Sequence, residues 1–322
     1  YDDLVSVAER LCRQTKTRVL AVACKGSNPT DEVVSRRLGG VKIPVLRVPC
    51  AGRVPMEFYA KLLADGIVER LHVLPCEEEF CRLKEGGRIS LLRLSYLRGL
   101  LSNIRFDGDI LTVTKASNRA VVDPARCIGC GNCERHCPYE AAYVAPPGIS
   151  NIDPEKCMGC GICLAVCPNF AISLEGYRHE ELSKAIASYM MRLKSFGKTE
   201  NPILVMYCQW AGAPKLPEGD GNNICFLELP CAGRADMLHV LQALNMGFSG
   251  VLIVACKQEL CNFEEAGAKK AERQLSFLKE NLKQLGLENR VDIAFVHPKY
   301  PGEFEQAISS FLEKIKVGGG SV

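Results

Sequence analysis

The sequence lacks most of the features that mark common protein classes. No run approaches the roughly 18 consecutive apolar residues of a membrane-spanning helix, so no membrane span of its own is expected. No long basic run is present and the net charge is only +3, which makes nucleic acid a poor candidate partner. The chain also lacks a Walker sequence and a G-x-G-x-x-G motif after a strand. It therefore gives no support for a flavin or nicotinamide site.

Residues typical of catalytic sites are also scarce. The five histidines are scattered, and no Ser-His-Asp or Cys-His arrangement is evident. His136 adjoins a cysteine at a position that needs no ligand. His72 and His239 lie among apolar residues, and we expect both to be packed side chains. No catalytic residue is predicted from motifs.

Cysteine, by contrast, is abundant, with 18 in 322 residues. Disulfide frameworks are typical of short secreted chains. This chain is long enough for two or three ordinary cores, and its cysteines have metal-ligand spacing. We therefore expect reduced thiols and a cytoplasmic location, with any membrane association arising through another subunit. Because the sequence begins at Tyr1 and not at Met, we also expect N-terminal residues to be missing.

The strongest motif is Asp-Pro-x-x-Cys-x-Gly-Cys-Gly-x-Cys-x-x-x-Cys-Pro, which occurs at residues 123–138 and again at residues 153–168. Bacterial ferredoxins use such runs for two [4Fe–4S] clusters, and the fourth cysteine of each run ligates the other cluster. We assign the two ligand sets as Cys127, Cys130, Cys133 and Cys167, and Cys157, Cys160, Cys163 and Cys137. A pair of structural zinc sites is the alternative, but zinc modules usually use separated cysteine pairs. The motif predicts a protein that carries electrons.

A longer repeat surrounds these motifs. Val-Pro-Cys-Ala-Gly-Arg at residues 48–53 matches Leu-Pro-Cys-Ala-Gly-Arg at residues 229–234, and a Cys-x4-Cys pair follows each. Two quartets of cysteines recur in register, namely Cys24, Cys50, Cys76 and Cys81, and Cys208, Cys231, Cys256 and Cys261. Four thiolates could hold a [2Fe–2S] cluster or a zinc ion, or the cysteines could be free core residues. Cys12 and Cys225 lack a counterpart in the other copy and are expected to pack in the core.

The pattern of apolar residues in each copy predicts alternating strands and helices. Strands are expected to end at the first three cysteines of each copy, and a fourth is expected at residues 110–114 and 291–296. Helical stretches are expected at residues 56–64, 88–101 and 180–194, the last with apolar residues at i, i+3, i+4 and i+7. This alternation predicts parallel βαβ units. Because the carboxyl ends of parallel strands share one edge of a sheet, where ligands bind, each quartet is predicted to gather there.

On these residues the outer repeat resembles the delta subunit of methyl-viologen-reducing hydrogenase. The similar segments are Cys208-Gln209-Trp210, Cys231-Ala-Gly-Arg234, Cys256-x4-Cys261 and GEFEQAISSF at residues 302–311. The first copy is similar through its own four cysteines but lacks the tryptophan. The resemblance covers most of residues 1–115 and 179–316, while residues 116–178 resemble a two-[4Fe–4S] ferredoxin.

The resemblance implies three domains. Two α/β delta subunit-like domains with parallel sheets, at residues 1–115 and 179–322, would flank an α+β ferredoxin-like two-[4Fe–4S] domain at residues 116–178. It also implies a [2Fe–2S] cluster in each outer domain, held by the two quartets. Ser27 and Ala211 stand where the family often has a further cysteine. The implied partners are a flavin-bearing subunit similar to heterodisulfide reductase A, and a hydrogenase, formate dehydrogenase or other reductase.

The leading hypothesis is therefore an electron-transfer subunit of an oxidoreductase complex. One alternative is an enzyme that reduces a disulfide or heterodisulfide with the outer quartets, although redox thiols are often Cys-x-x-Cys pairs of lowered pKa and the outer repeats have none. The other is a ferredoxin with zinc-bound docking domains. Arg53 and Arg234 could raise the potential of a nearby cluster or be solvated, and Trp210 could shield a cluster or be ordinary core.

Overall fold

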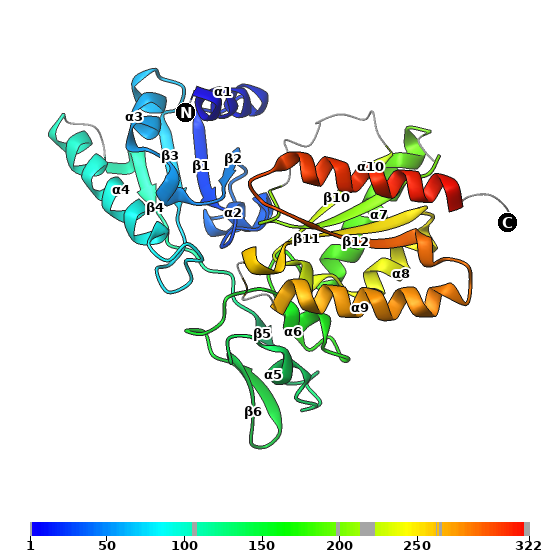
Figure 1. The fold of residues 1–322 in the computed structure, drawn as a ribbon. Helices are drawn as coiled ribbons and strands as arrows, with labels where there is room; N and C mark the ends of the chain where they lie inside the picture. The colour runs from blue at the N-terminus through cyan, green and yellow to red at the C-terminus, as the bar shows by residue number, and fades with distance from the viewer. Residues whose placement is uncertain are drawn as a thin grey trace. The chain divides into compact units, whose positions relative to one another are not determined.

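The computed structural model describes residues 2–104, 108–197, 200–212, 223–261, 263 and 266–318. The chain divides into two units, Tyr1–Arg119 and Ala120–Val322, which Figure 1 shows in blue to cyan and in green to red. The second unit contains both the ferredoxin-like motifs and the second copy of the outer repeat.

The first unit is built on a parallel sheet with the strand order β2-β1-β3-β4. Its strands are β1 (Val19–Cys24), β2 (Val45–Val48), β3 (Arg70–Leu74) and β4 (Leu111–Val113). Its helices are α1 (Asp2–Thr15), α2 (Asp31–Arg37), α3 (Met56–Ala64) and α4 (Gly86–Asn103), with short 3-10 helices η1 (Ala51–Arg53) and η2 (Gly108–Ile110). Alternate residues of β1 enter two different core clusters. The central strand is therefore covered on both faces, as is usual in a parallel sheet.

The second unit repeats this sheet, with the strand order β10-β9-β11-β12 and all pairs parallel. The strands are β9 (Ile203–Cys208), β10 (Ile224–Leu229), β11 (Gly250–Cys256) and β12 (Val291–Val296). The helices are α7 (His179–Ser195), α8 (Met237–Met246), α9 (Ala266–Lys283) and α10 (Pro301–Gly318), with 3-10 helices η3 (Ala232–Arg234), η4 (Gln258–Leu260) and η5 (Glu288–Arg290). Figure 1 shows α10 along one side of this sheet, with α8 and α9 along the other. Every residue of β9 and β11 is buried between them.

The ferredoxin-like segment forms two small antiparallel sheets with two short helices. Strand β5 (Val121–Val122) pairs with β8 (Ile172–Ser173), and β6 (Ala142–Ala145) pairs with β7 (Ile149–Ile152). The helices are α5 (Asn132–His136) and α6 (Ile162–Ala165). Each begins directly after a glycine with positive φ, Gly131 at 72° and Gly161 at 79°, a conformation that glycine adopts without steric cost.

The observed fold confirms the predicted class, which was two parallel α/β sheets on either side of a ferredoxin-like segment in the sequence. The predicted strand ends were wrong in three places, because β2, β3 and β10 end two residues before Cys50, Cys76 and Cys231. In each case a proline precedes the cysteine, and proline has no N–H with which to continue a ladder. Where no proline intervenes, β1, β9 and β11 run through to the cysteine. Among the described residues, no helix combines the length and the apolar character needed to cross a bilayer.

Candidate metal centres

The four cysteines of the first quartet lie together beyond the carboxyl ends of β1, β2 and β3. Cys24 ends β1, Cys50 precedes η1, and Cys76 and Cys81 follow β3, and all four are buried. The thiol of Cys24 lies within hydrogen-bonding reach of those of Cys50 and Cys76. In the strand order β2-β1-β3-β4, the chain adds β2 on one side of β1 and β3 on the other. The quartet therefore lies where the strand order reverses, between β1 and β3. Such switch points are the usual ligand sites of open parallel sheets.

The start of α4 completes the wall around this quartet. A side chain on Gly86 would collide with Sγ of Cys50 and press on Sγ of Cys81, so both sulfur atoms flank the same turn. Backbone amides also donate to the sulfurs, from Ala51 to Cys24 at 3.1 Å and from Gly87 to Cys81 at 3.3 Å. Amide hydrogen bonds of this kind stabilise thiolates and tune bound clusters.

The second quartet has the same construction. Sγ of Cys208, at the end of β9, lies 3.7 Å from Sγ of Cys256, at the end of β11. The thiol of Cys231 lies within hydrogen-bonding reach of both Cys208 and Cys261. Gly267, in the first turn of α9, occupies the place that Gly86 has in the first copy, against the sulfur of Cys231. The structure thus brings together all four predicted residues in each copy.

Hydrogen bonds between the thiols lower the pKa of two sulfurs in each quartet, Cys50 and Cys76 in the first copy and Cys208 and Cys261 in the second. A hydrogen bond from Cys24 lowers the pKa of Cys50 to about 6, although burial opposes this. In the second copy a hydrogen bond from Cys231 lowers the pKa of Cys261 to about 6, again against the effect of burial. Because metals bind thiolates and release protons from thiols, both quartets are suited to a metal or an iron–sulfur cluster.

The ferredoxin-like segment contains two cavities lined by cysteines, and their linings match the predicted exchange of the fourth cysteine. The first cavity is lined by Cys127, Cys130, Cys133 and Cys167. The second is lined by Cys137, Cys157, Cys160 and Cys163. Each cavity therefore takes three cysteines from one run and one cysteine from the other.

Backbone amides point at the sulfurs of both cavities. In the first cavity, the amide of Ser150 donates to Sγ of Cys127 at 3.4 Å, and the amide of Ala171 donates to Sγ of Cys167 at 3.3 Å. In the second cavity, the amide of Ala141 donates to Sγ of Cys137 at 3.3 Å, and the amide of Ala120 donates to Sγ of Cys157 at 3.4 Å. This donor set fits [4Fe–4S] clusters, whose sulfurs accept such bonds. The two cavities differ in exposure, because Cys130 is exposed while Cys157, Cys160 and Cys163 are buried.

The second cavity and the second quartet share a wall inside the second unit. Cys160 and Cys231 belong to one small buried cluster with Ile162 and Phe263. Gly161 packs so closely on the side chain of Arg234 that a Cβ would lie 2.9 Å from its Cδ. Trp210 packs against the same cluster and is only partly buried. Residues of two predicted sites, more than 70 positions apart in the sequence, are thus in one packed cluster.

Arg234 lies in this wall and is fully buried, whereas Arg53, its counterpart in the first copy, is exposed. The guanidinium donates from Nε and Nη2 to the carbonyl oxygen of Tyr177, at 3.1 and 2.9 Å. Burial lowers the pKa of Arg234 to about 10, so it is charged at neutral pH. Arg234 therefore lies where a positive charge could act on a cluster, whereas Arg53 is placed as a solvated residue.

Sequence reasoning missed a second buried basic residue here. Lys270 donates from Nζ to the carbonyl oxygen of Gly233 at 2.7 Å and to Gln274 at 2.8 Å, and burial lowers its pKa to about 7. The two copies differ at this position, because Ile89 of the first copy is equivalent to Lys270 of the second. That difference was the available signal in the sequence.

Cys12 and Cys225 lie in the cores of their units. Ser27, at a position where the family often has cysteine, is fully buried with Oγ 3.4 Å from Sγ of Cys76, so it adjoins the first quartet. His72 bonds through Nδ1 to Oγ1 of Thr112.

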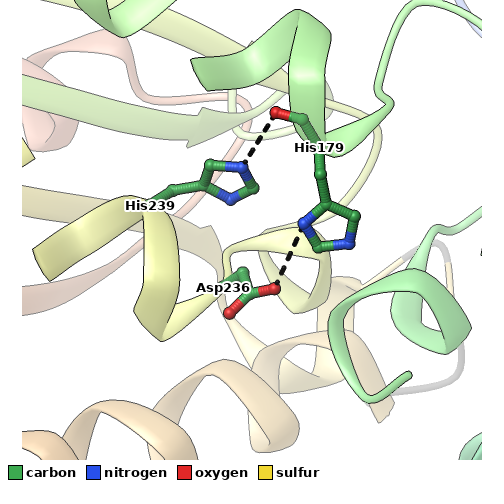
Figure 2. A group of neighbouring side chains, drawn as sticks. All are labelled: His179, Asp236 and His239. Atoms are coloured by element: carbon green, nitrogen blue, oxygen red, sulfur yellow. Dashed lines mark hydrogen bonds and ion pairs between the residues drawn. The ribbon is translucent and has the colours of Figure 1, made fainter. Parts of the chain in front are cut away.

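Sequence reasoning also missed a group of three side chains in the second unit, His179, Asp236 and His239 (Figure 2). The sequence predicts a packed side chain at His239, and His239 is fully buried, but its grouping with the other two residues is not predicted. Asp236 and His239 lie three residues apart at the start of α8, and the equivalent residues of the first copy are Pro55 and Phe58. That difference between the copies was the available signal.

Comparison with known proteins identifies the family. The profile described as "Methyl-viologen-reducing hydrogenase, delta subunit" matches residues 19–128 and 203–318, which is more than half of the chain. The chain belongs to this family. A profile for a 4Fe-4S dicluster domain matches residues 120–174, so the chain carries a dicluster domain between two family segments.

Curated relatives fall into two groups. The A component of the ferredoxin:CoB-CoM heterodisulfide reductase of Methanosarcina mazei is 30% identical over 207 residues, which are 61% of this chain and 25% of that protein. The iron-sulfur subunit of the vhu F420-non-reducing hydrogenase of Methanopyrus kandleri is 30% identical over 127 residues, 37% of this chain and 95% of that protein. The iron-sulfur subunit of the F420-non-reducing hydrogenase of Archaeoglobus profundus is 29% identical over 124 residues, 36% of this chain and 90% of that protein. The chain thus spans about a quarter of the length of the reductase component.

Proposed function

We propose that the chain is an electron-transfer subunit. It would relay electrons between a flavin-bearing subunit similar to heterodisulfide reductase A and another redox partner, either a hydrogenase, a formate dehydrogenase or another reductase. Two [4Fe–4S] clusters would be held by the eight cysteines of the dicluster domain, and two [2Fe–2S] clusters by the outer quartets. When bound, such clusters supply one-electron transfer at potentials set by their ligands, hydrogen bonds and burial. Domain boundaries at residues 115/116 and 178/179 are part of the same proposal.

The wall shared by the second quartet and the second cavity is the observation that carries this function. Redox centres exchange electrons only when they lie close together, and here Cys231 of one site and Cys160 of the other belong to one buried cluster. The interior contacts of the wall are apolar, through Ile162 and Phe263, and its buried cation is Arg234. A positive charge stabilises the reduced, more negative form of a neighbouring cluster. The arrangement therefore favours passage of electrons between these two sites.

The first cavity has the properties of a contact point for a redox partner. Cys130 is exposed, and the neighbouring Ile128 is 64% exposed. The second cavity and the second quartet are mostly buried, so they suit internal steps. Within the second unit the order would be second quartet, second cavity, first cavity. The first quartet belongs to the other unit and is proposed as a further relay.

Seven of the eight cysteines of the outer quartets are buried and only Cys261 is partly exposed, which favours electron transfer over disulfide reduction. An enzyme of that kind must present a reactive, accessible thiolate to its substrate. Cys24, Cys208 and Cys231 are at most 3% exposed. The names of the relatives add support, since they include both a component of a heterodisulfide reductase and iron-sulfur subunits of hydrogenases.

The test is metal analysis of anaerobically purified full chain, combined with EPR of the reduced protein. We expect about twelve irons and about as many acid-labile sulfides per chain, from two cubane and two dinuclear clusters. A value near eight irons with about two zinc ions would reject the outer redox sites and support the zinc-docking alternative.

Two cysteine variants make this test specific. Replacing Cys231 with serine should remove about two irons and one dinuclear EPR signal. Cys225→Ser is the matched control, because Cys225 lies in β10, is about as buried as Cys231 and is outside the quartet. Unchanged iron in Cys231→Ser would contradict the assignment of the second quartet.

A further inference from the structure

The buried group formed by His179, Asp236 and His239 has the geometry of a metal site. His179 is the first residue of α7, Asp236 caps the N-terminus of α8, and His239 lies in the first turn of α8. One candidate ligand atom of each residue lies within 4.8 Å of those of the other two. Nδ1 of His179 is 3.6 Å from Oδ2 of Asp236. Two ligands at about 2.0 to 2.1 Å from a tetrahedral metal are about 3.3 Å apart, so this spacing is close to that of a bound ion.

Backbone carbonyl groups determine which nitrogen of each imidazole is available. Nε2 of His179 bonds to the carbonyl oxygen of Leu164 at 3.2 Å, and Nε2 of His239 bonds to that of His179 at 3.3 Å. A carbonyl oxygen can only accept, so each Nε2 carries the hydrogen and each neutral ring has its lone pair on Nδ1. Histidines that ligate metals are held in the same way, with the second nitrogen donating to a carbonyl or carboxylate.

Both Nδ1 atoms are buried, and neither has a hydrogen-bond partner among the described residues. Figure 2 shows Nδ1 of His179 directed at the carboxylate of Asp236, and the free nitrogen of His239 on the side of its ring that faces the same space. His179 is 8% exposed and His239 is fully buried. Two lone pairs and a carboxylate oxygen thus lie within 4.8 Å of one another in a largely buried place. Buried polar atoms cost free energy unless they have a partner, and a cation between these three groups would supply one.

The tautomers fixed by these hydrogen bonds suit a metal ion, because metals bind the lone pair of a neutral imidazole. Arg234 and Lys270 are the basic residues that act on Asp236, and both oppose a further cation here. Both are bound elsewhere, since Arg234 donates to the carbonyl oxygen of Tyr177 and Lys270 donates to that of Gly233 and to Gln274.

We propose that His179, Asp236 and His239 form a mononuclear site for a divalent transition metal, with zinc the best match. Two imidazole nitrogens and one carboxylate oxygen are preferred zinc ligands, and three protein ligands leave a fourth position open. The site goes beyond the proposed electron transfer, because it needs no redox change at the metal. It would hold α7 to α8 beside Leu164, next to the second cavity.

The repeat supplies an internal comparison. In the first copy, Pro55 and Phe58 stand at the positions of Asp236 and His239, and Phe58 is fully buried. The first copy therefore lacks two of the three ligands while keeping its cysteine quartet and its fold. The replacement His239→Phe reproduces a residue that this fold already accommodates at the equivalent position.

The experiment measures zinc in the full chain purified anaerobically from zinc-supplemented cells. We expect about one zinc per chain, and zinc-edge X-ray absorption with nitrogen and oxygen neighbours at about 2.0–2.1 Å rather than sulfur at about 2.3 Å. His239→Phe should lose this zinc and keep its iron. Asp236→Asn, which retains an oxygen to cap the amide of Leu238, should bind zinc at least tenfold more weakly in competition with a chelator. His297→Gln, a change outside the group, should leave zinc unchanged.

Three outcomes would overturn the site. These are no zinc above background, zinc coordinated only by sulfur, or zinc that both His239→Phe and Asp236→Asn retain in full. Zinc bound only by sulfur, with iron reduced to about eight per chain, would instead place zinc in the outer quartets. That result would also count against the proposed outer redox sites, whereas absence of zinc with full iron would overturn this inference alone.

Discussion

Replacing Gly267 with alanine should remove the metal from the second quartet and leave the dicluster domain intact. Gly267 lies in the first turn of α9, where an added Cβ would be 2.0 Å from Sγ of Cys231. Real Cβ atoms essentially never approach another heavy atom more closely than 3.0 Å, so the sulfur must move by at least 1.0 Å. Cys231 is 1% exposed and packed against Ile162 and Phe263, so the sulfur cannot move without disturbing its neighbours.

The required movement is large on the scale of a metal site. Ligand distances in such sites hold to within about 0.2 Å, so the displacement is about five times that tolerance. We expect Gly267→Ala to contain about ten irons per chain instead of about twelve, and to lose one dinuclear EPR signal. The two [4Fe–4S] signals should persist, because the eight cysteines of the dicluster domain are unchanged, and their presence reports that the variant has folded.

Two further variants serve as comparisons. Gly86→Ala places a Cβ 2.4 Å from Sγ of Cys50 and should have the same effect on the first quartet. Gly302→Ala lies in α10 with nothing within 4 Å of its Cβ, so its iron content should equal that of the unchanged protein. If Gly267→Ala keeps all its iron and both dinuclear signals, Cys231 is not a cluster ligand and the assignment of the second quartet is wrong.

Two predictions concern stability rather than iron. Burial alone raises the pKa of Asp292, but hydrogen bonds from Lys314 and Lys279 outweigh it and lower the pKa. These ion pairs therefore stabilise the fold above the unfolded carboxyl pKa of about 4, and lose their effect as pH falls through the folded pKa. Because both lysines are partly exposed, Asp292→Asn should cost about 1 kcal/mol in urea unfolding at pH 7 and almost nothing near pH 2; an equal cost at both pH values would contradict this reasoning. Gly99→Ala, in the exposed middle of α4 with no heavy atom near its Cβ, should stabilise the chain by about 0.5–1 kcal/mol, and a lower urea midpoint would show that this position tolerates no side chain.

Much of the fold and of the cysteine sites could be predicted from the sequence, because the patterns involved are local. The spacing of cysteine and glycine within each ferredoxin-like run is enough to predict three corners of a cubane site. Apolar periodicity predicted α3 at its observed bounds and α7 and α4 to within two residues at each end. Repetition of Cys-Ala-Gly-Arg and Cys-x4-Cys predicted that each quartet belongs to one domain. The strand ends at Cys50, Cys76 and Cys231 were missed, although the prolines before them were the available local signal.

Only the tertiary structure decided how these local pieces meet. Arg53 and Arg234 occupy identical sequence motifs, yet one is exposed and the other fully buried, because only the second copy packs its arginine against Gly161 of the dicluster domain. The shared wall between Cys160 and Cys231, and the convergence of His179 with Asp236 and His239, likewise join residues about 60 or more positions apart. Such contacts depend on how whole elements pack, and packing between distant segments leaves no periodic trace in the sequence of either one.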